Sequence, residues 1–171
     1  MRCNPAFPRR ETGAIYVEAI HKRIDIKRPI DRVFAYVDDP ATAMEWLPSM
    51  MGVRNISGTG IGARHEWTYR MAGLFLDGES TTIAHLPCER RVVRSRGGID
   101  ALWTFALEPR GEGTRLELTL EYNVPPALIS RMAEQLVVRR NDREIGRAIK
   151  SIKDYCEGRS PADLQRLGFL V

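Results

Sequence analysis

The residues best suited to chemistry lie in one alternating stretch, from Ala63 to Met71. One parity of this stretch carries the bulky residues and a histidine, Ala63, His65, Trp67, Tyr69 and Met71. The alternation predicts a strand with one buried face. A histidine of ordinary pKa, about 6.5, can act as a general base near neutral pH, and a tyrosine on the same face can share the proton transfer. His65 and Tyr69 are therefore the candidate catalytic residues, with a hydrogen-bonded wall histidine as the alternative.

Other reaction chemistries find no support in the sequence. The three histidines have no metal-ligand spacing, so neither a metal nor another cofactor is expected. There is no G-x-S-x-G nucleophile motif, and no cysteine has neighbours that would activate it. The glycine-rich string from Gly58 to Gly62 resembles a phosphate loop, but strand-like alternation follows it, so a turn is expected instead.

Composition predicts one globular domain in the cytoplasm. The chain has 171 residues, 43% of them hydrophobic and 28% charged, with a net charge of +4. Five like charges never occur in a row, so nucleic acid is not an expected partner. The three cysteines are odd in number and lack a C-x-x-C pair, which favours a reducing compartment. No apolar window reaches the ~18 residues that a transmembrane helix needs.

The elements that must position these residues can be predicted from periodicity. Alternation of period two predicts seven strands, at Ile15–Lys27, Val53–Ser57, Ala63–Met71, Leu74–Leu86, Glu89–Arg96, Ile99–Glu108 and Thr114–Val124. Two short helices, Ile30–Val37 and Ala41–Leu47, separate the first strand from the second, and a long helix is expected over Pro125–Glu157. Short turns between successive strands predict an antiparallel sheet that curls around the last helix, an α+β fold.

The last helix carries two apolar stripes that do not line up. Its second half places apolar residues on one side, Val138, Ile145, Ile149, Ile152 and Cys156, and basic residues opposite, Arg140, Arg143, Arg147 and Lys150. Carried backward, the same geometry puts Ile129, Met132 and Leu136 on the basic side. We expect a kink or break between Val137 and Asp142. The alternative is an exposed apolar patch that meets a partner, a second copy or a membrane surface.

Several short stretches carry a family resemblance. They are the segment from Ile24 to Pro29 with Val33-Phe34 after it, Glu45-Trp46-Leu47-Pro48, the glycine loop, Trp103-Thr104-Phe105, and Gly113-Thr114-Arg115-Leu116 ahead of Tyr122. The chain resembles the helix-grip superfamily of START domains and birch-pollen allergens (SRPBCC), in its bacterial polyketide cyclase/dehydrase-like branch. The resemblance covers residues 14–157. Residues 1–13 are then an N-terminal extension, and residues 158–171 a tail with a short amphipathic helix.

The resemblance implies a ligand cavity between the concave sheet and the last helix. The inward parity then nominates the residues that contact the ligand, Trp67, Trp103, Phe105, Leu118, Leu120 and Tyr122, to which the helix adds Asn141, Asp142 and Ile145. Asn141 stands on the apolar line of the helix, where a purely structural helix would carry leucine. A buried amide satisfied by the backbone or by water is the alternative.

Three functions stay open on the sequence alone. Members of the superfamily include lipid and hormone carriers, aromatase/cyclases and coenzyme Q-binding proteins. The first hypothesis is binding of a small hydrophobic or aromatic ligand, such as a lipid, polyketide or quinone. The second is a polyketide cyclase, aromatase or dehydratase in which His65 and Tyr69 move protons and Asn141 holds a carbonyl. The third is a protein-interaction module that uses the Ile129, Met132 and Leu136 patch.

Overall fold

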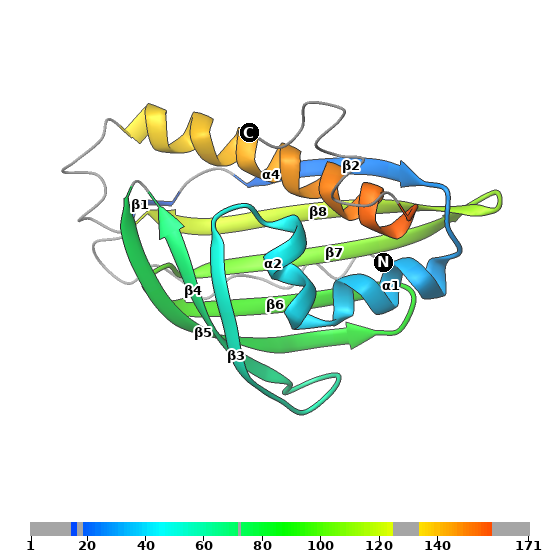
Figure 1. Cartoon of the computed structure of the whole chain (residues 1–171), viewed down its shortest axis with the longest axis horizontal. Helices are drawn as coiled ribbons and strands as arrows, with labels where there is room; N and C mark the ends of the chain where they lie inside the picture. Colours follow the sequence, from blue (N-terminus) through cyan, green and yellow to red (C-terminus); the bar gives the residue numbers. More distant parts are fainter. Residues whose placement is uncertain (1–14, 17–18, 72, 125–133, 159–171) are drawn as a thin grey trace, which may run out of the picture.

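The fold is a single curved antiparallel sheet with helices on its concave side (Figure 1). The computed structural model describes residues 15–16, 19–71, 73–124 and 134–158. The strands are β1 (Ile15–Tyr16), β2 (Ile20–Ile26), β3 (Met50–Ser57), β4 (Arg64–Met71), β5 (Leu74–Leu86), β6 (Arg90–Gly97), β7 (Ala101–Arg110) and β8 (Gly113–Val124). The helices are α1 (Ile30–Asp38), the short 3-10 helix η1 (Pro40–Thr42), α2 (Ala43–Trp46) and α4 (Glu134–Cys156).

Sheet order follows the chain from β3 to β8, each strand pairing with the next in antiparallel register. Both β1 and β2 pair with β8, where Ile15 lies opposite Val124 and Ile20 opposite Leu120. They therefore occupy one edge position in succession, and the described sheet is seven strands wide. The predicted α+β fold with a seven-stranded antiparallel sheet is confirmed.

Two paired glycines let β5 pass close beneath a tryptophan. Gly78 lies opposite Trp67 on β4 and opposite Gly97 on β6. A Cβ atom on Gly78 would overlap the Trp67 ring and the Arg96 carbonyl oxygen, and Gly97 has a φ of 124°. Only glycine fits such close approaches, and they allow the sheet to bend strongly here. The indole of Trp67 therefore lies on the concave face directly over the Gly78 backbone.

Helix α4 lies across the concave side along β2 and against α2, as Figure 1 shows. Among the described side chains of this helix, the buried apolar ones are Ile145, Ala148, Ile149 and Ile152. The predicted basic side, Arg140, Arg143, Arg147 and Lys150, is exposed. None of the helices in the described part of the chain is long and apolar enough to span a bilayer.

The predicted break in this helix is wrong. Helix α4 runs without interruption from Glu134 to Cys156, through the whole of Val137–Asp142. That segment contains no glycine or proline to interrupt the backbone ladder. Ile129, Met132 and the side chain of Leu136 lie outside the described part, so the apolar patch stays a prediction. Residues 1–13 and 159–171 of the predicted extension and tail lie outside it as well.

The two early helices close the remaining side of the concave face. Pro29 precedes α1, whose buried residues Val33, Phe34 and Val37 recur at helical spacing. The side chain of Asp39 then accepts a hydrogen bond of 2.9 Å from the Ala41 amide at the start of η1, which turns the chain into α2. Trp46, at the end of α2, is consequently placed against the sheet.

Candidate functional site

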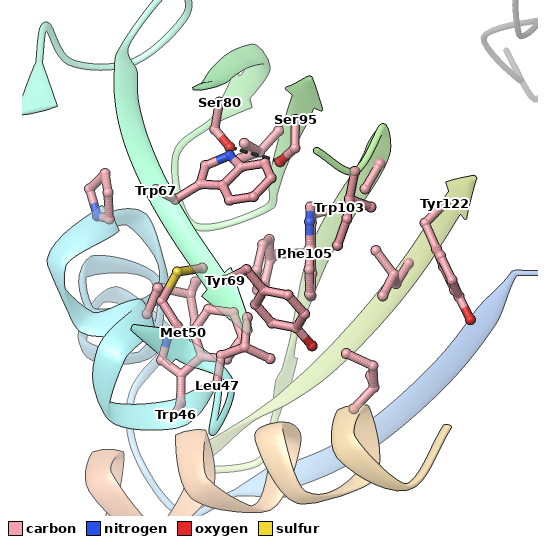
Figure 2. A pocket seen from close by; sticks show the side chains of 18 of the residues that line it. Trp46, Leu47, Met50, Trp67, Tyr69, Ser80, Ser95, Trp103, Phe105 and Tyr122 are labelled. Carbon is pink, nitrogen blue, oxygen red and sulfur yellow. Dashed lines mark hydrogen bonds between the residues drawn. The ribbon is translucent and has the colours of Figure 1, made fainter. Parts of the chain in front are cut away.

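A cavity remains between the concave sheet, α2 and α4 (Figure 2). Its empty volume is about 870 Å³, part of it open to solvent. Apolar and aromatic side chains from β4, β6, β7 and β8 form most of its wall, and the last helix contributes Asn141, Glu144 and Ile145. Pockets that hold small molecules typically have a mostly apolar wall of this kind with a few polar groups.

Aromatic rings form a continuous wall along one side of this cavity. The ring of Trp46 meets Trp103 edge-on with centroids 6.1 Å apart, and meets Phe105 likewise at 6.0 Å. Such edge-to-face packing fixes the rings in place. The wall is therefore a rigid apolar surface against which a flat or chain-like molecule can pack.

The structure brings together nine of the eleven residues predicted for the site. Those that line the cavity are His65, Trp67, Tyr69, Trp103, Phe105, Leu120, Tyr122, Asn141 and Ile145. Leu118 is fully buried in the core and is not among the lining residues, because strand parity gives the face but not the position along the strand. Asp142 does not reach the cavity either, since it is exposed and its carboxylate pairs with Lys22 at 2.7 Å on the surface.

Several polar residues of the cavity are not among those predicted from the sequence. Ser80 on β5 and Ser95 on β6 face each other at 2.7 Å, and both are buried. Arg91 and Glu144 also line the cavity. A usable signal existed for β6, where Arg91, Val93 and Ser95 share one parity. The sequence offers no such signal for Glu144, since a charged residue on a basic helix predicts a surface position.

Arg91 is a buried arginine whose charge is balanced within the protein. It is 5% exposed, its Nε atom lies 3.3 Å from Asp38, and one of its amino groups donates a 2.6 Å hydrogen bond to the Val37 carbonyl. Burial lowers the pKa of Arg91, while Asp38 and Asp39 oppose that shift. The Nε2 atom of His85 also contacts Asp38, at 3.0 Å. This cluster ties the end of α1 to β5 and β6.

Comparison with known proteins identifies the family. Residues 18–157 match the family described as "Polyketide cyclase / dehydrase and lipid transport". The chain belongs to this family. No curated protein sequence is similar enough to count as a relative. The family and the fold together indicate a ligand-binding or polyketide-cyclase-like domain of the SRPBCC superfamily.

Solved structures with a similar fold support this assignment at the level of architecture. The protein TTHA0849 from Thermus thermophilus superposes with a TM-score of 0.69 at 20% identity, over 81% of this chain and 96% of that one. The Zhui aromatase/cyclase from Streptomyces sp. R1128 superposes with a TM-score of 0.65 at 17% identity, over 88% of this chain and 98% of that one. Ara h 8.0201 superposes with a TM-score of 0.59 at 15% identity, over 84% of this chain and 98% of that one. At these identities the similarity shows the fold alone.

In the wall of this cavity, His65 is a weak base. Burial, with a smaller effect from the charge of Arg91, lowers the pKa of His65 to about 4. The imidazole is therefore neutral near pH 7. It can donate or accept a hydrogen bond with a ligand, but it binds a second proton only in acid. In the described residues no group of three or more histidine, cysteine or acidic side chains could hold a metal ion.

The low pKa of His65 predicts a loss of stability in acid. As the pH falls from about 6.5 to about 4, the unfolded chain binds a proton that the folded protein excludes, so the free energy of unfolding decreases. With allowance for partial exposure, the loss is of order 1–2 kcal/mol. Urea unfolding of the wild type and His65→Gln between pH 4 and 7 measures it. We expect the two stability curves to diverge in this window; parallel curves would contradict the assigned pKa.

Glu144 links α4 to the turn that follows α2. Its carboxylate accepts a 3.1 Å hydrogen bond from the Ser49 amide. Tyr69 lies near this contact, and burial, followed by the negative charge of Glu144, raises the pKa of Tyr69 well above its usual value. The phenol therefore stays protonated at physiological pH, and it can take part in hydrogen bonds as a donor or an acceptor.

Three buried polar atoms of cavity-lining residues have no hydrogen-bond partner in the described part of the protein. One is the Nε atom of Arg91, which forms an ion pair with Asp38 at 3.3 Å. The other two are the indole nitrogen of Trp67 and the hydroxyl oxygen of Tyr122. The Asn141 amide lies beside the Tyr122 hydroxyl without a well-formed hydrogen bond. It lowers the tyrosine pKa, against the larger effect of burial, which raises it. A buried polar group without a hydrogen bond costs about 1–3 kcal/mol. A ligand can therefore supply the missing hydrogen bond at the Trp67 nitrogen and at the Tyr122 hydroxyl.

Proposed function

We propose that this protein binds a small hydrophobic or aromatic molecule, such as a lipid, a polyketide or a quinone, in the cavity beneath α4. The observation that carries the proposal is a mostly apolar cavity with a rigid aromatic wall. A folded core normally packs without such space. Burying apolar surface contributes about 25 cal/mol per Å², which makes such a cavity a favourable site for an apolar guest.

The orphaned polar atoms support ligand binding over a purely structural void. An empty apolar cavity has no need for polar groups, and a packed core would pair them. Trp67 and Tyr122 instead present an N–H and an O–H group in a mostly apolar wall. A few placed polar groups among aromatic residues are what orient a small molecule in a protein pocket.

The enzymatic alternative has a weaker physical basis. His65 and Tyr69 do line the same cavity, as a proton-transfer mechanism requires. However, general acid–base catalysis is most effective when the pKa lies near the working pH. The pKa of His65 is about 4, and that of Tyr69 is raised far above neutral. The two groups suit hydrogen bonding to a bound molecule better than exchange of protons with it.

A neutral fluorescent probe tests the proposal directly. N-phenyl-1-naphthylamine fluoresces strongly only in apolar surroundings and carries no charge. We expect saturable binding of one probe per chain with a Kd in the micromolar range, on the order of −8 kcal/mol. Unfolding in urea should release the probe. A fluorescence change that never saturates, or that persists in the unfolded protein, would contradict a defined cavity site.

A further inference from the structure

One end of the cavity gathers hydrogen-bond donors that the protein itself leaves unused. Trp67 is 4% exposed, and its indole N–H has no partner among the described residues. An indole nitrogen can donate but cannot accept, so only an acceptor can satisfy it. Figure 2 shows this nitrogen at the end of the cavity formed by β4, β5 and β6, away from Tyr122.

The buried serine pair adds a second donor at the same end. In register, Trp67 lies opposite Gly78, and Ser80 lies two residues further along the same face of β5. The Ser80 and Ser95 hydroxyls share one hydrogen bond of 2.7 Å. Whichever serine donates, the accepting hydroxyl still has its own proton to offer. Both serines line the cavity, so this proton and the indole N–H serve the same small volume.

Local charge favours an uncharged partner for these donors. On the inward face of the sheet the nearest cation along β6 is Arg91, four residues before Ser95. Its guanidinium forms an ion pair with Asp38 and donates a hydrogen bond to the Val37 carbonyl. An anionic group here would lose its hydration without gaining an unpaired cation. A neutral oxygen has a smaller desolvation cost and still accepts both hydrogen bonds.

We infer that this end of the cavity is a subsite for a neutral oxygen acceptor, a carbonyl or ether oxygen of the ligand, held by the Trp67 indole N–H and by the Ser80–Ser95 hydroxyl pair. The inference rests on the proposed function and narrows it: the ligand is an apolar molecule with an uncharged oxygen at one end. Trp67 is the residue that discriminates, and Gly78 positions its ring, because any side chain at that position would displace the indole.

Three naphthalene probes of one ring system test the subsite. These are 2-acetylnaphthalene, which carries a carbonyl oxygen, 2-ethylnaphthalene, which lacks it, and the anion 2-naphthoate. Calorimetric titration gives the ratio of ketone to hydrocarbon affinity in the wild type and in Trp67→Phe. We expect that ratio to fall about five- to tenfold in the variant, the effect of one hydrogen bond. Naphthoate should bind at least about tenfold more weakly than the ketone. Trp103→Phe, a change in the same cavity, should leave the ratio unaltered.

The NMR signal of the Trp67 indole N–H gives a second readout, which does not depend on probe binding to any variant. The chain has three tryptophans, so its ¹H–¹⁵N spectrum contains three indole signals, which single Trp→Phe changes assign. We expect the ketone to move the Trp67 indole proton downfield and the hydrocarbon not to do so. An unmoved signal, an affinity ratio unchanged in Trp67→Phe, or tightest binding of naphthoate would overturn the subsite, with a bound water then satisfying the N–H. Failure of all three probes to bind would overturn the proposed function as well.

Discussion

Replacing Ala101 with phenylalanine should abolish binding of the neutral naphthylamine probe and leave the protein folded. Ala101 lies on β7, lines the cavity and is opposite Tyr122 in register. A phenylalanine ring at this position would occupy the space that the ligand needs. We expect Kd to rise at least about thirtyfold, which corresponds to roughly 2 kcal/mol. The midpoint of urea unfolding should stay the same or rise, because the new ring fills empty volume.

Ala106→Phe is the matched control for this change. Ala106 lies on the same strand with the opposite parity, is opposite Arg90 and Glu117, and does not line the cavity. The same ring added there should leave Kd within about twofold of the wild type, as expected for a change outside the site. Retained binding in Ala101→Phe, or equal losses in both variants, would show that the probe binds elsewhere.

Replacing Arg91 with methionine should destabilise the fold by about 2–4 kcal/mol, because it removes one partner from a buried ion pair. Methionine approximates the apolar stem of the side chain but cannot donate to the Val37 carbonyl or balance Asp38. The end of α1 then loses its polar attachment to β6. The midpoint of urea unfolding, measured near pH 7, reports the loss directly.

Arg54→Met separates this effect from loss of an arginine in general. Arg54 on β3 pairs with Glu66 at 3.0 Å, but its side chain is 48% exposed. Surface pairs of this kind contribute about 0–1 kcal/mol, so this variant should unfold close to the wild type. Similar losses in the two variants would mean that burial of Arg91 does not strengthen its contacts.

Strand periodicity explains why the sheet could be predicted from the sequence. Antiparallel strands with one buried face alternate visibly, and residues such as Trp67, Trp103 and Tyr122 share the inward parity. Strand boundaries follow less directly from alternation: β3 begins at Met50 rather than Val53, since its first residues pair through a bulge that interrupts the alternation.

The polar parts of the cavity depend on contacts that alternation does not encode. Ser80 and Ser95 come together because β5 and β6 pair in one particular register. Asn141 and Asp142 are neighbours in sequence, yet one side chain is buried and the other faces solvent, since adjacent helix positions differ by ~100°. The prediction of a kink or break in α4 assumes that its two apolar stripes face one surface. A continuous helix can carry apolar residues on two different sides, because its backbone hydrogen bonds do not depend on which side is buried.

Native mass spectrometry of the freshly purified protein, followed by denaturing extraction, tests the central claim most directly. The cavity should hold an apolar molecule acquired in the cell, seen as one added mass per chain that denaturation releases. Ala101→Phe, prepared in parallel, should carry no such mass. Wild-type protein that is empty after purification and remains empty after incubation with neutral naphthalene probes would contradict the proposal that the cavity is a ligand site.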